Sequence, residues 1–341
     1  MRAVWITRHG GPEVLAVREA PDPEPRPGEV RVRVAACGLN FAETSARKGL
    51  YPDAPPPPCV VGYEGAGTVD AVGSGVTSLG PGARVVYLSH FGGHADVVCV
   101  PAANVLELPA AMSFDEAAAL PVNYLTAFHM LFRLARLRAG ERVLVHMAAG
   151  GVGTAVLQLC RTVEGVQVFG TCSRGKHDYA RSHGCDHPID YHAVDYAAEV
   201  RQATGGRGVD LVLDPLGGAD WAKGYGLLAP TGMLIAFGLA NASRGSGKRS
   251  LARAAVQLAR APWFTPMKLM SDNRTVSGCN MGHLWGETEL LRGELTELLA
   301  LYERGAVRPH VGGRFSFERA GDAHQELELG RNVGKVLLVP R

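Results

Sequence analysis

One stretch near the middle of the chain restricts its possible folds more than any other. Residues 143–147 are an apolar run, and the glycine-rich segment 148–153 leads from it into a second apolar stretch at 154–159. A strand that enters a glycine turn and then a helix is typical of a dinucleotide-binding βαβ unit, because glycines let backbone N–H groups approach a pyrophosphate. The pattern assigns these contacts to Gly150, Gly151, Val152 and Gly153.

A tight strand-to-helix turn that binds nothing is the alternative, since Ala148 stands at the first glycine position of the G-x-G-x-x-G pattern. The segments that follow favour the dinucleotide interpretation. Further strands are predicted at 166–171, 209–214 and 233–238, and helices between them at 178–183 and 196–204. This alternation predicts a doubly wound parallel sheet that is covered by helices on both faces.

Length and composition set the remaining limits. A chain of 341 residues is long for one hydrophobic core, so we expect two domains. A net charge of +2 favours no nucleic-acid partner. The seven cysteines are scattered and form no C-x-x-C pair, which fits reduced thiols in the cytoplasm. No signal segment and no membrane-spanning run is present, so we expect a cytoplasmic protein without a membrane partner.

The chain before the glycine turn has a different character. Residues 30–34 alternate strictly with period two, and glycine turns recur at 73–75 and 80–82. Short strands with frequent turns predict a compact antiparallel barrel. The last apolar segment, at 334–339, is also predicted to be a strand, and we expect it to return to this first domain.

Several motifs together resemble one family over nearly the whole chain: the zinc-independent quinone oxidoreductase branch of the medium-chain dehydrogenase/reductase superfamily. Segment 273–284 is most similar to the subgroup of synaptic-vesicle membrane protein homologues, and similar motifs occur in polyketide-synthase enoyl reductase domains. The resemblance implies an α/β fold with a GroES-like β-barrel catalytic domain at 1–122 and 283–341, and an NADP-binding Rossmann domain at 123–282. The motifs that carry it are 38–43, 62–67, 120–127, 148–153 and 332–336.

The chain departs from the zinc-dependent relatives where their metal ligands stand. Asn40 replaces a cysteine, Tyr63 replaces a histidine, and Val122 lies near the place of another cysteine. A catalytic zinc needs about three protein ligands, so we predict no metal. His90 and His94 have helical ligand spacing, but the two glycines between them favour a pair in a loop.

Without a Lewis acid, hydride transfer to a quinone or an α,β-unsaturated carbonyl is favoured over alcohol oxidation. The resemblance places four hydrogen-bond donors near the nicotinamide, and Tyr51 among them is the best candidate for the proton donor. Each tyrosine could instead be a buried phenol bonded to a backbone carbonyl, and Asn40 could be a turn residue. The four donors are Asn40, Tyr51, Tyr63 and Tyr124.

The loop after the second nucleotide strand indicates which cofactor binds. An NAD site usually has an acid there, whereas residues 170–176 contain no acid and two cations. Ser173, Arg174 and Lys176 therefore predict a site for the 2′-phosphate of NADPH, and the resemblance adds Tyr191 to it. A solvated basic loop is the alternative.

The resemblance also implies roles at the nicotinamide end and in the segment that returns from the C-terminus. Asp214 ends an apolar strand on the side where ligands bind, and it could equally cap the turn that follows. The other residues assigned to the cofactor in this way are Asn123, Thr126, Phe237, Gly238, Asn332 and Lys335.

Residues 248–260 predict a basic amphipathic helix in the least family-like part of the chain. It could bind a membrane surface or a partner, or it could be a lid or packing helix beside the substrate cleft. The strand at 275–280 lies where relatives pair edge to edge across a two-fold axis, so we expect a homodimer.

We therefore predict a zinc-independent, NADPH-dependent reductase whose substrate is a quinone, an enone or an enoyl thioester. A tailoring reductase of a secondary-metabolite intermediate is one alternative. A non-catalytic NADP-binding adaptor at membranes is another; the basic helix supports it, whereas Tyr51 and Asn40 favour catalysis.

Overall fold

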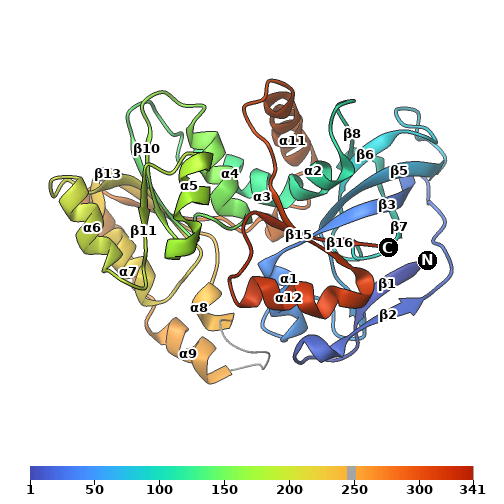
Figure 1. The fold of residues 1–341 in the computed structure, drawn as a ribbon, viewed down its shortest axis with the longest axis horizontal. Coiled ribbons are helices and arrows are strands. Elements are labelled where there is room, and N and C mark those ends of the chain that lie inside the picture. The colour runs from blue at the N-terminus through green and yellow to red at the C-terminus, as the bar shows by residue number, and fades with distance from the viewer. Residues whose placement is uncertain (244–250, 341) are drawn as a thin grey trace. The chain divides into compact units, whose positions relative to one another are not determined.

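The computed structural model describes residues 1–243 and 251–340, and it divides into two compact units (Figure 1). Unit 1 contains Met1–Leu125 and the chain from Met281 onward. Unit 2 contains residues 126–243 and 251–280. The sequence analysis placed the two boundaries at 122/123 and 282/283.

Unit 1 is built on a mostly antiparallel sheet with the strand order β15-β16-β3-β5-β6-β8, and β7 pairs with β3. A smaller antiparallel sheet has the order β2-β1-β4. The last strand, β16, pairs antiparallel with β3, which confirms the predicted return to the first domain. The strands are β1 (Arg2–Ile6), β2 (Leu15–Glu19), β3 (Glu29–Leu39), β4 (Cys59–Val60), β5 (Glu64–Val72), β6 (Arg84–Leu88), β7 (Val97–Pro101), β8 (Val105–Glu107), β15 (Val311–Ser316) and β16 (Lys335–Val339).

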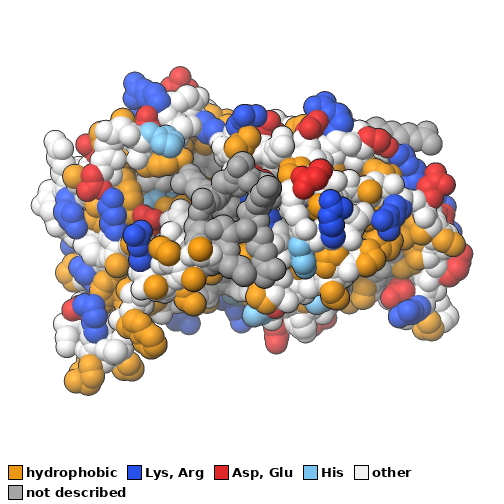
Figure 2. Space-filling model, turned by 90° about the horizontal axis from the view of Figure 1, so that it is seen from below, with side chains coloured by type: hydrophobic (Ala, Val, Ile, Leu, Met, Phe, Trp, Pro, Cys, Tyr) orange, Lys and Arg blue, Asp and Glu red, His pale blue; other side chains and the backbone are white. Residues whose placement is uncertain are grey.

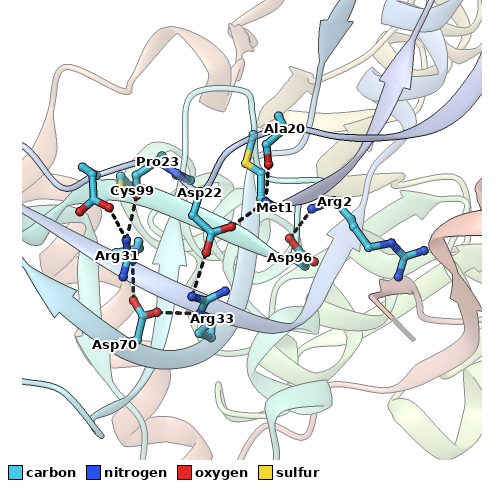
Figure 3. A network of polar contacts seen from close by, with 11 residues as sticks. Met1, Arg2, Ala20, Asp22, Pro23, Arg31, Arg33, Asp70, Asp96 and Cys99 are labelled. Atoms are coloured by element: carbon cyan, nitrogen blue, oxygen red, sulfur yellow. Dashed lines mark hydrogen bonds and ion pairs between the residues drawn. The ribbon is translucent and has the colours of Figure 1, made fainter.

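The predicted alternation at 30–34 is realised in β3. Its valines at 30, 32 and 34 are buried in the core of unit 1. The two arginines between them share Asp70 of β5, to which Arg31 Nε donates at 2.8 Å and Arg33 Nε at 2.6 Å (Figure 3). Arg33 Nη2 also lies 2.8 Å from Asp22 Oδ2. One face of the strand is thus held by burial and the other by ion pairs.

Short helices complete unit 1. The α-helices are α1 (Phe41–Arg47), α2 (Phe114–Ala119), α11 (Thr288–Glu303) and α12 (Ala320–Glu328), and the 3₁₀ turns are η1 (Pro12–Val14), η2 (Ala102–Asn104), η5 (Met281–His283) and η6 (Phe317–Arg319). Helix α3 (Pro121–Phe128) crosses from unit 1 into unit 2 and continues as a π-helical turn, η3 (His129–Leu134). His90 and His94 lie in the loop between β6 and β7, as predicted.

Unit 2 has one parallel sheet with the strand order β11-β10-β9-β12-β13-β14, which confirms the predicted doubly wound fold (Figure 1). Its strands are β9 (Arg142–His146), β10 (Gln167–Thr171), β11 (His187–Ile189), β12 (Val209–Asp214), β13 (Leu228–Ala236) and β14 (Thr275–Gly278). Its helices are α4 (Gly151–Cys160), η4 (Arg174–Lys176), α5 (His177–His183), α6 (Tyr196–Ala203), α7 (Ala219–Tyr225), α8 (Ala240–Ser243), α9 (Leu251–Ala259) and α10 (Pro266–Asp272).

Three details of unit 2 differ from the sequence prediction. Strand β13 begins earlier than predicted and ends at Ala236, so Phe237 and Gly238 follow the strand. Strand β14 ends at Gly278. The predicted helix 248–260 is observed as α9, and its first three residues lie outside the described part of the chain.

All seven cysteines are free thiols. Within residues 1–243 and 251–340, we find no helix that has both the length and the apolar character needed to cross a bilayer.

Candidate functional site

A buried polar network joins three distant segments of unit 1. Asn40 precedes α1, Glu64 begins β5 and Lys335 begins β16, and all three side chains are buried. Lys335 Nζ donates to Asn40 Oδ1 at 2.6 Å and also to Glu64 Oε1. Asn40 Nδ2 donates to Glu64 Oε1 at 2.9 Å. The three groups therefore satisfy one another inside the fold, as buried charges must.

Two further contacts fix the position of Glu64. Its second carboxylate oxygen accepts the backbone N–H of Val122 at 2.7 Å, at the start of α3. Gly38 of β3 leaves the space that the network occupies, because a Cβ there would lie 2.7 Å from the Glu64 carboxyl carbon and from Lys335 Cε. Any larger residue at position 38 would have to displace the ion pair.

A second carboxyl group, that of Glu43, lies beside this network. It accepts the backbone N–H of Asn40 at 2.6 Å, and His94 Nε2 lies 3.5 Å from it and 3.2 Å from the carbonyl oxygen of Gly38. Burial raises the pKa of Glu43 to about 8 and lowers the pKa of His94 to about 4. Near pH 7 both groups are therefore mainly neutral.

These contacts change the interpretation of two predicted site residues. The amide of Asn40, predicted to contact the substrate, is engaged with Glu64 and Lys335. The ammonium of Lys335, predicted to reach the cofactor, is turned into the same network. Sequence reasoning did not assign Glu43 or His94 to this site. The available signal was the spacing of Asn40 and Glu43, which is that of a capping box at the start of α1.

The network also bears on metal binding. The ammonium of Lys335 already balances the charge of Glu64, so a divalent cation at this place would meet a buried cation. In the part of the chain that the structure describes, no group of three or more His, Cys, Asp or Glu side chains could hold a metal ion.

The structure brings two of the predicted tyrosines together. Tyr51 is half-buried, and burial raises the pKa of its hydroxyl. Tyr63 is buried, and its pKa is raised by burial first and then by the neighbouring Tyr51. Both phenols therefore keep their protons at neutral pH and are able to donate a hydrogen bond. The third tyrosine, Tyr124, is buried in α3.

In unit 2, the glycine turn has the geometry that a pyrophosphate requires. The helical hydrogen bonds of α4 begin with the N–H of Thr154, which donates to the carbonyl of Gly150 at 2.8 Å. The N–H groups of residues 151–153 thus precede the first bond within the helix, at the end where the helix dipole attracts an anion. At Gly153 a Cβ would lie 2.5 Å from the carbonyl oxygen of Ala148, so only glycine fits.

The predicted 2′-phosphate residues gather at one edge of the same sheet. Strands β10 and β11 are parallel neighbours, and Thr171 pairs with Ile189 where each strand ends. Residues 173–176 follow the end of β10, and Tyr191 follows the end of β11. Both loops therefore leave the sheet at the same edge. Arg174 is exposed, and the side chains of Ser173, Lys176 and Tyr191 are at least partly exposed.

Asp214, at the end of β12, caps the turn that follows. Its Oδ1 accepts the N–H of Leu216 at 2.6 Å and of Gly217 at 3.2 Å, which is one of the two roles considered for it. Burial raises its pKa to about 6. The backbone N–H of Phe237 donates to the carbonyl of Asp214 at 3.0 Å, so the start of the segment 237–238 is tied to the same turn.

One neighbour of Asp214 was missed by sequence reasoning. His146 Nε2, at the end of β9, lies 4.0 Å from Asp214 Oδ2, and its Nδ1 lies 2.9 Å from Thr171 Oγ1. Burial lowers the pKa of His146 to about 3, so the ring is neutral. The ends of β9, β10 and β12 thus meet at His146. In the sequence, this histidine is visible only as one position of an apolar run.

The remaining predicted cofactor residues lie on two segments. Asn123 and Thr126 are buried on α3. Asn332 precedes β16, and its Nδ2 donates to the carbonyl of Gly334 at 3.0 Å. Their roles toward a cofactor stay predictions.

Comparison with known proteins agrees with this architecture. The family model for the alcohol dehydrogenase GroES-like domain matches residues 26–110, and the model for zinc-binding dehydrogenases matches residues 183–338. The GroES-like domain and the parallel sheet with its glycine turn are together the fold of a nicotinamide-type oxidoreductase. The chain belongs to the medium-chain dehydrogenase/reductase superfamily, in its quinone oxidoreductase branch.

Within that superfamily, the chain is similar to the synaptic vesicle membrane protein VAT-1 homolog of Homo sapiens. The two are 47% identical over 346 residues, which cover 100% of this chain and 86% of that protein. The Escherichia coli quinone oxidoreductase complexed with NADPH superposes with a TM-score of 0.88 at 30% identity, covering 100% of both chains. The CurK enoyl reductase gives a TM-score of 0.85 at 27% identity, covering 99% of this chain and 98% of that one.

Proposed function

We propose that the protein is an NADPH-dependent, zinc-independent reductase that transfers hydride to a quinone or to an activated carbon–carbon double bond. The start of α4 is the observation that carries the proposal, because three backbone N–H groups precede its first helical bond and Gly153 has no room for a side chain. Relatives of this branch support it: one is named a quinone oxidoreductase and was solved with NADPH.

The chain's own residues have separate tasks in this proposal. The N–H groups of residues 151–153 bind the pyrophosphate, and Arg174 and Lys176 attract the 2′-phosphate charge. When bound, NADPH supplies a hydride. Tyr51 carries a proton on its hydroxyl at neutral pH, as a phenol ordinarily does, and burial raises its pKa further. It can therefore donate a hydrogen bond to the acceptor's carbonyl oxygen as negative charge develops there.

The buried network is consistent with a mechanism that uses no Lewis acid in unit 1. In zinc-dependent relatives a metal would polarise the carbonyl, whereas here Asn40 and Lys335 neutralise and hold Glu64. The network is therefore a positioning element that fixes α1, β5 and β16 relative to each other. Polarisation of the carbonyl falls to the phenol donors, Tyr51 and Tyr63.

The role of Tyr51 is tested by its replacement with phenylalanine. We expect Tyr51→Phe to lower kcat/KM for NADPH-dependent reduction by about 10²-fold, the usual size for loss of a general acid, with little change in the binding of NADPH. Tyr87→Phe is the matched control, since Tyr87 is a buried tyrosine of β6 outside the tyrosine pair. Equal kcat/KM values for wild type and Tyr51→Phe would remove the proton-donor role.

The preference for NADPH over NADH is tested by a double variant that removes two positive charges. Arg174→Ala/Lys176→Ala should raise the Kd for NADPH by about tenfold or more, since hydrogen bonds to charged groups contribute about 1.5–3 kcal/mol each. The Kd for NADH should stay unchanged. Arg201→Ala, at an exposed position of α6, is the control. Tighter binding of NADH than of NADPH by the wild type would contradict the proposal.

One surface observation favours a second candidate, an NADP-binding adaptor that binds an apolar surface. Residues around α9 and α10 expose large apolar side chains, and Figure 2 shows hydrophobic side chains on the face of unit 2 that carries α9. Trp263 is 92% exposed and Leu258 is 73% exposed. The wild type should then co-sediment with phosphatidylcholine liposomes, and the double variant Leu258→Ser/Trp263→Ser should not. Absence of wild-type binding would end this candidate.

A further inference from the structure

Four aromatic rings form a cluster in unit 1 beside Tyr51, and sequence reasoning joined only one of them to the site. We call it the Trp285 cluster: Tyr63, His90, Phe91 and Trp285. The rings of Tyr63 and Trp285 are nearly parallel, with an interplanar angle of 13° and centroids 5.9 Å apart. Phe91 lies 5.2 Å from Tyr63, and His90 lies 6.1 Å from Trp285. Three separate segments thus present aromatic surface at one place.

One buried donor of the cluster lacks a partner. Nε1 of Trp285 is buried and makes no hydrogen bond within the described residues, whereas the buried hydroxyl of Tyr63 has the hydroxyl of Tyr51 as its polar neighbour. An indole N–H is only a donor, and burial keeps the Tyr63 phenol protonated. A buried donor without an acceptor is costly and calls for an explanation. A ligand's carbonyl oxygen, which accepts through two lone pairs, would supply the acceptor that the indole N–H lacks.

The cluster is held by polar and backbone constraints. His283 Nε2 lies 2.9 Å from Asp53 Oδ2, so the segment that carries Trp285 is joined to the segment that carries Tyr51. Phe91 has a φ of 68°, in the left-handed region that a residue with a bulky side chain rarely adopts. Strained backbone of this kind persists where the surrounding structure imposes it, and it often marks a functional site.

The cluster is also within reach of solvent. His90 is exposed, and Phe91 and Trp285 are partly exposed, whereas Tyr63 is buried. A flat ligand can therefore approach the aromatic surface while its polar end meets the inner donors.

We propose that the Trp285 cluster recognises the carbonyl of a flat, conjugated ring, an inference that rests on the proposed reductase function. Tyr63 O–H and Trp285 Nε1–H donate to the carbonyl oxygen, and the aromatic faces stack on the ring. A linear enone or enoyl thioester accepts the same hydrogen bonds but offers no ring to stack. The cluster therefore selects cyclic quinone-type acceptors over linear acyl acceptors, and Trp285 is its specificity-determining residue.

The test begins with binding, which does not depend on turnover. Tetramethyl-1,4-benzoquinone is the probe, because its fully substituted ring does not readily add thiols, and its Kd is measured by equilibrium dialysis without cofactor. Trp285→Phe keeps a ring and removes the N–H, and Trp285→Leu removes both. We expect the Kd to rise by about threefold to tenfold in Trp285→Phe and further in Trp285→Leu. Trp221→Phe, at a tryptophan of α7 in unit 2 whose indole nitrogen is likewise buried without a partner among the described residues, should bind like the wild type.

Turnover then tests selection. The ratio of kcat/KM for the same quinone to kcat/KM for trans-2-hexenal should fall at least fivefold in Trp285→Leu. A Kd within twofold of wild type in both Trp285 variants would overturn the inference, and so would an equal loss of activity on both acceptors. If the wild type binds the quinone through Trp285 but oxidises no NADPH, the recognition site stands and the proposed reductase function fails. Trp285→Phe, which preserves the ring, keeps the test valid should Trp285→Leu not fold.

Discussion

The polar network of unit 1 and the glycine turn of unit 2 differ in whether their polar groups find hydrogen-bond partners within the fold. In the network, Glu64, Asn40 and Lys335 are buried and satisfy one another through side chains from distant segments. At the turn, the N–H groups of residues 151–153 precede the first bond of their helix and point away from it. One region is already neutralised and gives rigidity, whereas the other has donors that suit an external anion.

The comparison predicts that breaking the network has the largest effect, and that this effect is on stability. Lys335→Met leaves the buried Glu64 carboxylate without its cation, which should cost about 3–5 kcal/mol of unfolding free energy. Urea unfolding measures it. The double variant Glu64→Gln/Lys335→Met should recover most of the loss, because no buried charge remains. A loss below about 1 kcal/mol in the single variant would show that the pair is not buried as described.

Crowding the glycine turn should cost less stability but remove binding. In Gly153→Ala the new methyl group would lie 2.5 Å from the carbonyl oxygen of Ala148, and overpacking of this kind costs about 1–3 kcal/mol. The distorted helix start should also lose NADPH affinity, measured by isothermal titration calorimetry. Gly293→Ala is the matched control, because a Cβ there meets open space on α11 and should stabilise the helix slightly. Unchanged NADPH affinity in Gly153→Ala would separate this turn from the cofactor.

The pH dependence of stability sharpens the account of unit 1. Burial raises the pKa of Glu43 to about 8, so between pH 6.5 and 8 the folded state holds a proton that the unfolded state has released. Stability should therefore fall as pH rises through this window, by about 1–2 kcal/mol from this group. The buried His94, whose pKa is lowered to about 4, acts in the opposite direction, because it stays neutral while the unfolded histidine takes up a proton near and below pH 6.5; most of its effect therefore lies below this window.

Glu43→Gln provides the control for that prediction, because it is neutral at every pH. Its unfolding free energy should change less than that of the wild type between pH 6.5 and 8. An unfolding free energy that changes with pH as much in Glu43→Gln as in the wild type would contradict a protonated Glu43.

The smallest expected effect concerns the open edge of the unit 2 sheet. Within the described residues, β14 pairs only with β13, and Val276 lies on it. We propose that a second copy pairs there, so size-exclusion chromatography with light scattering should give a dimer mass. Gly278→Pro removes a donor from the open edge, because the N–H of the next residue, Cys279, is the one bonded to β13, and it should shift the mass toward the monomer. A monomeric wild type would remove this prediction.

Local patterns carried most of what could be predicted. The strands, the parallel sheet and the glycine turn follow from periodicity and from backbone geometry within short segments, as in residues 142–160. The basic edge could be anticipated because Arg174 and Lys176 directly follow a strand. Its pairing with Tyr191 came from the family resemblance.

Long-range polar contacts could not be predicted in the same way. Asn40 and Lys335 are 295 positions apart, and nothing in either local sequence indicates that they share a buried carboxylate. Their assignment to substrate and cofactor followed the family motifs, whereas the structure shows both engaged with Glu64. The Trp285 cluster was missed for the same reason, because its rings come from three separate loops.

The most direct test of the central claim is NADPH consumption by the purified protein with a quinone, a linear enone and an enoyl thioester, each followed by product analysis. The account predicts that one NADPH is oxidised for each molecule of hydroquinone or saturated carbonyl formed, with NADPH preferred over NADH. Tight NADPH binding with no reduced product from any of the three acceptors would contradict it.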